Sequence, residues 1–114
     1  MKLGDIVCNL TEWAVEKPLV GRIYIFGSRV RGDHSDDSDL DIAIELDLAA
    51  ANGVDESGGI ATWAFETRGW ADELRQRLGL NIDLYQYLRD ATWSNINKAL
   101  EHSSILAYVK QTFD

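Results

Sequence analysis

Cysteine and proline are nearly missing from this chain of 114 residues, which contains one of each. The single cysteine, Cys8, excludes an intramolecular disulfide, and we expect it to be a buried apolar residue of a helix. Basic residues are scarce as well: 11 Lys and Arg compare with 19 Asp and Glu, for a net charge of −8. A chain this acidic lacks the basic face that extended, sequence-independent nucleic-acid binding requires.

Long apolar runs are also missing. No run is long enough to span a bilayer, and the N-terminus has no apolar stretch of signal-peptide length. We therefore expect a cytoplasmic protein that does not enter the membrane. Because the chain contains no repeat, low-complexity tract or linker, we place residues 1–114 in a single domain with a modest core.

Hydrophobic periodicity predicts helices alternating with three or four strands. The predicted helices are 3–14, a short one from Ser28, 60–78, and one that Asp90 caps and that carries Trp93 and Leu100. The predicted strands are 22–26, 39–46, 81–87 and 105–109, with 47–59 as an exposed loop. This order predicts an α/β (α+β) fold, with helices on one face of a small sheet. Order alone would equally allow a parallel doubly wound sheet.

The most informative pattern is Gly27-Ser28, ten residues, and then Asp39-Leu40-Asp41. An apolar strand leads into Gly27-Ser28, and a small polar turn at the end of a strand can bind phosphate through its backbone N–H groups. Asp39 and Asp41 point to the same side of their strand because side chains alternate between faces. Together these features predict a site for a metal-bound nucleoside triphosphate.

The same alternation predicts which strand residues face the site. Leu40, Ile42 and Ile44 suit a core, whereas Asp39, Asp41 and Glu45 face the other way. On the next strand Asp83 shares a face with Tyr85 and Tyr87, which makes Asp83 the third candidate carboxylate. We expect Glu45 at the surface. The two tyrosines are expected either to touch a base or a partner, or to pack across strands.

Two other motifs are excluded, and several neighbouring residues have simple interpretations. Asp33-His34 stands where a P-loop needs Lys-Ser/Thr, and Ile44 stands where an EF-hand needs its bidentate Glu. We expect Asp33, Asp36 and Asp37 to form a solvated acidic rim and His34 to be exposed.

The pattern Gly-Ser-x10-Asp-x-Asp resembles the signature of the polymerase-β-type nucleotidyltransferases. The short chain and its Gly-Ser-Arg-x-Arg-Gly form are similar to the minimal nucleotidyltransferases of bacteria and archaea, which include MntA-type antitoxins that pair with HEPN-domain toxins. The resemblance covers residues 23–46 closely and 81–87 loosely. It implies a mixed sheet with the polymerase-β-type nucleotidyltransferase core, and a third acidic residue on a later strand, which Asp83 matches.

The chemistry assigns a role to each motif residue. Two Mg²⁺ ions, bound together with ATP, activate the attacking oxygen and stabilise the leaving pyrophosphate. Asp39 and Asp41 are expected to hold the metals, and Asp83 to bind the catalytic metal and accept a proton. Gly27 and Ser28 are expected to bind phosphate, although Ser28 could instead be only a helix cap. We expect Arg31 to reach the nucleotide and Arg29 to lie at the surface or face a partner.

The favoured function is transfer of a nucleoside monophosphate, AMP from ATP, to a hydroxyl on a partner protein such as a small helical HEPN-type toxin. A chain this short has no room for an acceptor-binding domain, so a second copy or another protein must complete the site. Two alternatives stay open: a non-catalytic, antitoxin-like subunit that neutralises a HEPN toxin, and a small-molecule nucleotidyltransferase of the aminoglycoside type.

Overall fold

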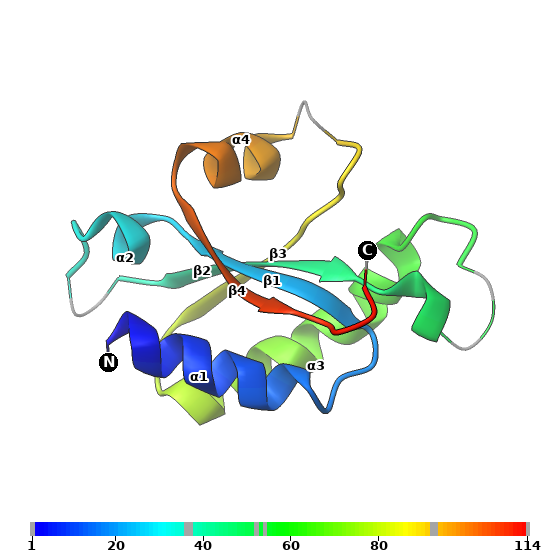
Figure 1. Ribbon diagram of the computed structural model, residues 1–114, viewed down its shortest axis with the longest axis horizontal. Coiled ribbons are helices and arrows are strands. Elements are labelled where there is room, and N and C mark those ends of the chain that lie inside the picture. Colours follow the sequence, from blue (N-terminus) through cyan, green and yellow to red (C-terminus); the bar gives the residue numbers. More distant parts are fainter. Residues whose placement is uncertain (1, 36–37, 52, 54, 92–93, 114) are drawn as a thin grey trace.

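The computed structural model describes residues 2–35, 38–51, 53, 55–91 and 94–113 (Figure 1). Asp36, Asp37 and Trp93 lie outside this range, so the predictions made for them are not addressed. The elements are α1 (Leu3–Ala14), β1 (Val20–Phe26), α2 (Ser28–Arg31), β2 (Leu40–Leu46), the 3-10 helix η1 (Leu48–Ala50), α3 (Ile60–Leu78), β3 (Ile82–Gln86), α4 (Asn95–His102) and β4 (Ser104–Val109).

The four strands form one mixed sheet in the order β3-β2-β1-β4. β1 is antiparallel to both β2 and β4, whereas β2 and β3 are parallel. The long α3 separates the parallel pair in sequence, as a parallel connection requires, while only a loop and the short α2 link the antiparallel β1 and β2. The mixed sheet is confirmed, and the doubly wound alternative is excluded.

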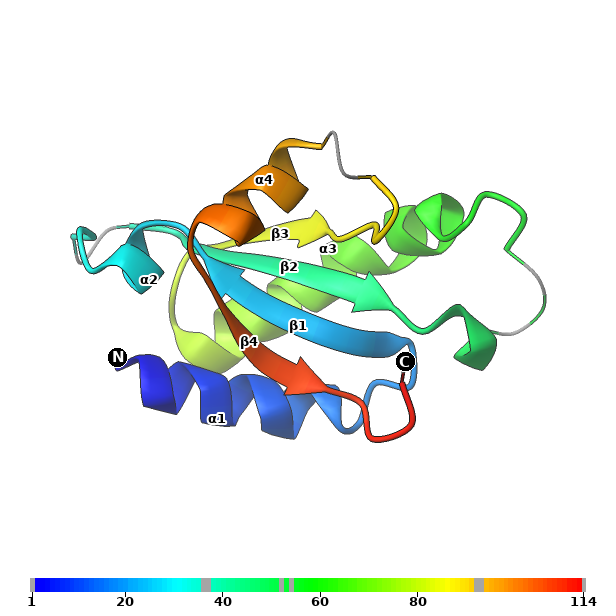
Figure 2. The ribbon, with the colours of Figure 1, turned by 45° about the horizontal axis from the view of Figure 1, so that its top comes forward.

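Helices α1 and α3 cover one face of the sheet, as predicted, but the short α4, which was expected on the same face, lies on the other side in both views (Figures 1 and 2). The core lies between the sheet and these two long helices. Its fully buried side chains include Leu10, Ile25, Ile42, Ile44 and Leu74. The predicted core face of β2 is therefore confirmed. None of the helices in the described part of the chain is long and apolar enough to cross a membrane.

Helix α4 begins later than predicted. Ser94, not Asp90, is its N-cap, and the Ser94 hydroxyl accepts a hydrogen bond from the Asn97 backbone N–H at 3.1 Å. Asp90 instead lies in a turn in which the Ala91 N–H donates to the Leu88 carbonyl at 3.0 Å. Aspartate and serine are both common N-cap residues, so the local sequence did not distinguish Asp90 from Ser94. In the structure Asp90 belongs to the turn that precedes the helix.

The prediction that Cys8 is buried was wrong. Ile6, Leu10 and Trp13 take the buried stripe of α1, and Cys8 lies about 200° around the helix from Ile6 and is exposed. The thiol lies 3.8 Å from a carboxylate oxygen of Glu12, one turn further along α1.

Candidate active site

The motif residues converge at one edge of the sheet, where β1 ends and β2 and β3 begin (Figure 2). Because β1 is antiparallel to β2, the turn that follows Phe26 lies beside the first residues of β2. Phe26 pairs with Asp41, and Asp41 pairs in turn with Asp83 on β3. The sheet register therefore places two of the predicted carboxylates side by side on adjacent strands, next to the Gly27-Ser28 turn.

Gly27 is in direct contact with the Asp41 carboxylate. Its backbone has φ of +83°, and a Cβ at this position would overlap Oδ2 of Asp41 and lie 3.1 Å from its Cγ. Only glycine combines that backbone conformation with that approach. The turn and the carboxylate strand thus form one continuous surface.

Ser28 is the first residue of α2, and Gly27 occupies the N-cap position. The Val30 N–H donates to the Gly27 carbonyl at 3.1 Å, which starts the helix without any side-chain cap. Ser28 is therefore not the N-cap. Its half-buried hydroxyl has no hydrogen-bond partner among the described residues and is available to a ligand.

The three carboxylates interact electrostatically. Burial raises the pKa of Asp41, and the charges of Asp83 and Asp39 raise this pKa further, whereas Arg31 opposes the rise. The pKa of Asp83 is raised by burial, by a hydrogen bond with Asp39 and by the Asp39 charge, against the opposing charge of Arg75. Like charges held this close favour binding of a cation, which would lower the pKa of both groups.

These residues fit Mg²⁺ in the chemistry of their donors, because carboxylate oxygens are the hard ligands that this ion prefers. In the conformation seen, the described residues contain no group of three His, Cys, Asp or Glu side chains that forms a complete ligand set. Mg²⁺ keeps waters and takes substrate phosphate oxygens, so one or two carboxylates are sufficient. Asp39, Asp41 and Asp83 would supply them.

The two arginines of the loop have different environments. Arg31 is about half exposed, its Nε lies 3.3 Å from Asp33, and it is near enough to affect the pKa of Asp41. Arg29 is only 6% exposed, and its Nε and Nη2 both donate to the Ser38 carbonyl, at 3.2 and 3.0 Å. The prediction that Arg29 lies at the surface or faces a partner was wrong.

Arg29 is a positioning residue that sequence reasoning missed. By holding Ser38 it fixes the segment that leads into Asp39, and so it links α2 to the carboxylate strand. The sequence carries no local signal for this contact, because the two residues meet only when the loop folds back. At the rim of the site, Asp33 and His34 are exposed as predicted.

Two pairs of aromatic side chains cover the face of the sheet that carries the candidate site, beyond Asp41. The rings of Phe26 and Tyr85 lie 5.5 Å apart, and those of Tyr24 and Tyr87 lie 5.4 Å apart, so both pairs bridge across β2. Ala43 lies on β2 between these strands and is fully buried. The tyrosines therefore pack across strands, which was one of the two expected outcomes for them.

Tyr85 also borders the carboxylates. Burial raises the pKa of its hydroxyl, and the charges of Asp41, Asp83 and Asp39 raise it further. The phenol therefore stays protonated at neutral pH beside the acidic cluster, where it can donate a hydrogen bond. The aromatic bridges thus confine the open, polar part of this face to the first residues of β2 and β3.

Glu45 is buried, contrary to the prediction of a surface position. The residue is 8% exposed, and its carboxylate is held by Arg22 at 2.9 Å and Arg89 at 3.0 Å. Both guanidinium groups also lie over the ring of Phe113, at 5.0 and 5.7 Å from its centroid. Because Arg89 and Phe113 come from far along the chain, strand alternation alone could not reveal this cluster.

A mixed sheet with a Gly-Ser turn against paired strand carboxylates is the core of a nucleotidyltransferase. The chain belongs to the polymerase beta nucleotidyltransferase family, which matches residues 9–112. No curated protein matches the chain in sequence.

Solved structures show the same fold. A crystal structure of a toxin–antitoxin with AMP-PNP has a TM-score of 0.60 and 25% identity, over 92% of this chain and 74% of that one. A mutant of the toxin–antitoxin MntA-HpeT has a TM-score of 0.54 and 26% identity, over 97% and 75%. A protein from Sulfolobus solfataricus, 22% identical over 94% and 79% with a TM-score of 0.53, shares the fold.

Proposed function

We propose that this chain transfers AMP from ATP to a hydroxyl group and releases pyrophosphate, in a reaction that depends on Mg²⁺. The observation that carries the proposal is the contact between the Gly27 backbone and the Asp41 carboxylate, which itself pairs in register with Asp83. A triphosphate bound at this turn would lie directly against the carboxylates that bind its metal ions.

In this proposal the residues of the site divide the tasks of the reaction between them. Bound Mg²⁺ polarises the reacting phosphate and stabilises the leaving pyrophosphate. Asp39 and Asp41 hold the metal, while the Ser28 hydroxyl donates to a phosphate oxygen and Arg31 offsets its charge. Asp83 would bind the catalytic metal ion. It is half-buried and its pKa is raised, which suits it to accept the proton of the attacking hydroxyl.

We propose that the acceptor hydroxyl belongs to a separate protein, a small helical HEPN-type partner. Two observations support a protein acceptor. The similar structures include toxin–antitoxin complexes, one of them with a nucleotide analogue. The net charge of −8 suits a partner with a basic surface, since complementary charge speeds encounter and fixes register.

Intact mass spectrometry of the co-expressed pair tests the transfer reaction. We expect the partner to gain about 329 Da for each AMP added, the mass of the transferred group. The same pair carrying Asp41→Asn should show no gain. If the partner binds tightly but gains no mass with any of the four nucleotides, the non-catalytic antitoxin function replaces the enzyme.

Ser28→Ala tests the phosphate turn separately. Because the Ser28 hydroxyl caps nothing, its removal should change the unfolding free energy by less than the ~1 kcal/mol typical of a lost cap. Affinity for Mg-ATP should fall severalfold, because one donor to phosphate is lost. Calorimetric titration with ATP beside thermal melts measures both effects. An unchanged ATP affinity would remove Ser28 from the binding site.

A further inference from the structure

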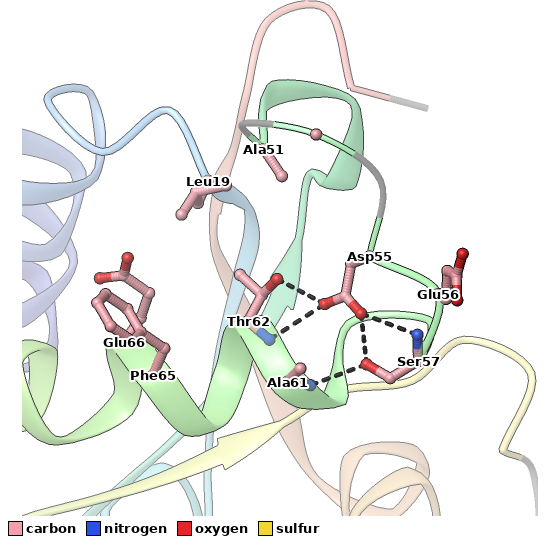
Figure 3. A pocket seen from close by; sticks show the side chains of 10 residues that line it. Leu19, Ala51, Asp55, Glu56, Ser57, Ala61, Thr62, Phe65 and Glu66 are labelled. Carbon is pink, nitrogen blue, oxygen red and sulfur yellow. Dashed lines mark hydrogen bonds between the residues drawn. The ribbon is translucent and has the colours of Figure 1, made fainter.

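A groove at the far end of the sheet is separate from the candidate active site. It has a volume of about 680 Å³ and lies between the first turns of α3 and the segments that carry Leu19 and Ala51 (Figure 3). Leu19 directly precedes β1, and Gly27 directly follows it. The seven residues of that strand separate groove and phosphate turn by roughly 23 Å, at ~3.3 Å per residue.

The groove has an apolar wall that includes an exposed aromatic ring. Phe65 is 84% exposed on α3, although the buried stripe of that helix holds Trp70, Leu74 and Leu78. Ala61 and Leu19 add further apolar surface to the lining. An isolated exposed apolar residue is ordinary, but a large ring that lines a groove is the arrangement found at interaction sites.

The rim of the groove is acidic. Asp55, Glu56 and Glu66 line it, and none of the lining residues that the structure describes is a lysine, arginine or histidine. Neither Glu56 nor Glu66 forms an ion pair with any residue that the structure describes. Arg68, one turn after Phe65, is exposed but is not part of the lining.

Asp55 has a fixed place in this rim. Its carboxylate accepts hydrogen bonds from the backbone N–H groups of Ser57, at 2.9 Å, and Thr62, at 3.1 Å, and from the hydroxyl groups of both residues. These bonds hold the pKa of Asp55 well below its usual range. They also join the loop to the first turn of α3 and so fix the position of Asp55 in the rim (Figure 3).

We propose that this groove is a docking surface for a segment of another protein, one that presents an apolar side chain flanked by lysine or arginine. The apolar side chain packs on Phe65, and the cations meet Glu56 and Glu66 and the face of the ring. A second copy of this chain is a poor occupant, because it carries the same acidic rim and a net charge of −8. The proposal does not depend on the transfer reaction.

Binding of a synthetic peptide tests the proposal without any activity measurement. The probe is a fluorescent amphipathic helix of leucine and lysine, about 14 residues long so that it can form a helix, and its counterpart has glutamate in place of lysine. We expect the lysine peptide to bind, and Phe65→Ser to weaken its binding at least tenfold. Leu106→Ser is the matched control, because Leu106 is also an exposed apolar side chain, 50% exposed, but lies on β4.

Further measurements separate a specific groove from general attraction to an acidic protein. The double substitution Glu56→Gln with Glu66→Gln should weaken binding severalfold, and rising salt should weaken binding to the native chain. Equal loss with Phe65→Ser and Leu106→Ser, or equal binding of the glutamate peptide, would overturn the proposal. So would sedimentation that shows a dimer dissociated by Phe65→Ser, which would make the occupant a second copy. Thermal melts of each variant confirm that it is folded.

Discussion

Replacing Asp41 with asparagine is expected to lower Mg²⁺-dependent transfer by several orders of magnitude while the fold survives. The asparagine side chain would keep the size and the contact with Gly27, but the change removes the carboxylate that we propose as a metal ligand, beside Asp39 and Asp83. The same loss is expected for Asp39→Asn. Rates of pyrophosphate release with Mg-ATP and an acceptor measure the effect, and near-native activity in either variant would refute the site assignment.

The stability of the Asp41 variant should change in the opposite direction. Because the folded-state pKa of Asp41 is raised, the folded chain holds this proton more tightly than the unfolded chain does. The native protein therefore loses stability as the pH rises from the ordinary aspartate pKa, about 4, through the higher folded value. Asparagine cannot ionise, so at pH 7 without metal the variant should melt at the same temperature as native protein or higher.

The control for this measurement is Asp90→Asn. Asp90 is exposed in the turn after β3, and the same chemical change there should alter neither the transfer rate nor the pH dependence of melting. Mg-ATP should raise the melting temperature of the native chain and of the control, because a ligand that binds only the folded state stabilises it. It should raise that of the Asp41→Asn variant much less.

Gly27→Ala is the second change with a large expected effect, on both stability and activity. Alanine at φ of +83° costs about 1–2 kcal/mol, and the overlap of its Cβ with Asp41 adds a cost of overpacking, about 1–3 kcal/mol. Transfer should fall by orders of magnitude, because the added Cβ displaces the Asp41 carboxylate from its position beside Asp83. Urea unfolding and the transfer assay measure the two effects.

Gly32→Ala separates these two costs. Gly32 has nearly the same φ, +84°, but a Cβ there meets nothing within 4 Å, so this variant should show only the backbone cost and retain activity. In an Asp41→Ala background, Gly27→Ala should likewise cost no more than Gly32→Ala. If the two glycine variants are equally destabilised in the native background, Gly27 does not contact the carboxylate in solution.

Much of the fold followed from local patterns. The apolar spacing of α3 gave its limits closely, because a long amphipathic helix closed by Gly79 depends on local geometry. The alternation of β2 correctly separated Leu40, Ile42 and Ile44 from Asp39 and Asp41, since strand pleating fixes which side chains share a face.

The wrong predictions concern residues whose surroundings come from other parts of the chain. Glu45 was expected at the surface because alternation ignores what covers a face, and here Arg22 and Arg89 cover it. Arg29 was expected outside because it cannot share a helix face with Arg31, which was expected to reach the nucleotide, but the Ser38 carbonyl binds Arg29 from across the loop. A polar side chain can be buried where distant partners meet its hydrogen-bonding needs, and such partners leave no local signature.

The sequence by itself determined the family signature, the strand that directly follows Asp39 and carries Asp41, and the turn that Gly27 and Ser28 form, because spacing and side-chain alternation are local properties of the chain. The tertiary structure alone decided that Asp83 pairs with Asp41, that Gly27 must be glycine to admit the Asp41 carboxylate, and that Phe65 borders an acidic groove. Each of these depends on the register and packing of elements far apart in sequence, which are set by the burial of the whole core rather than by any one segment.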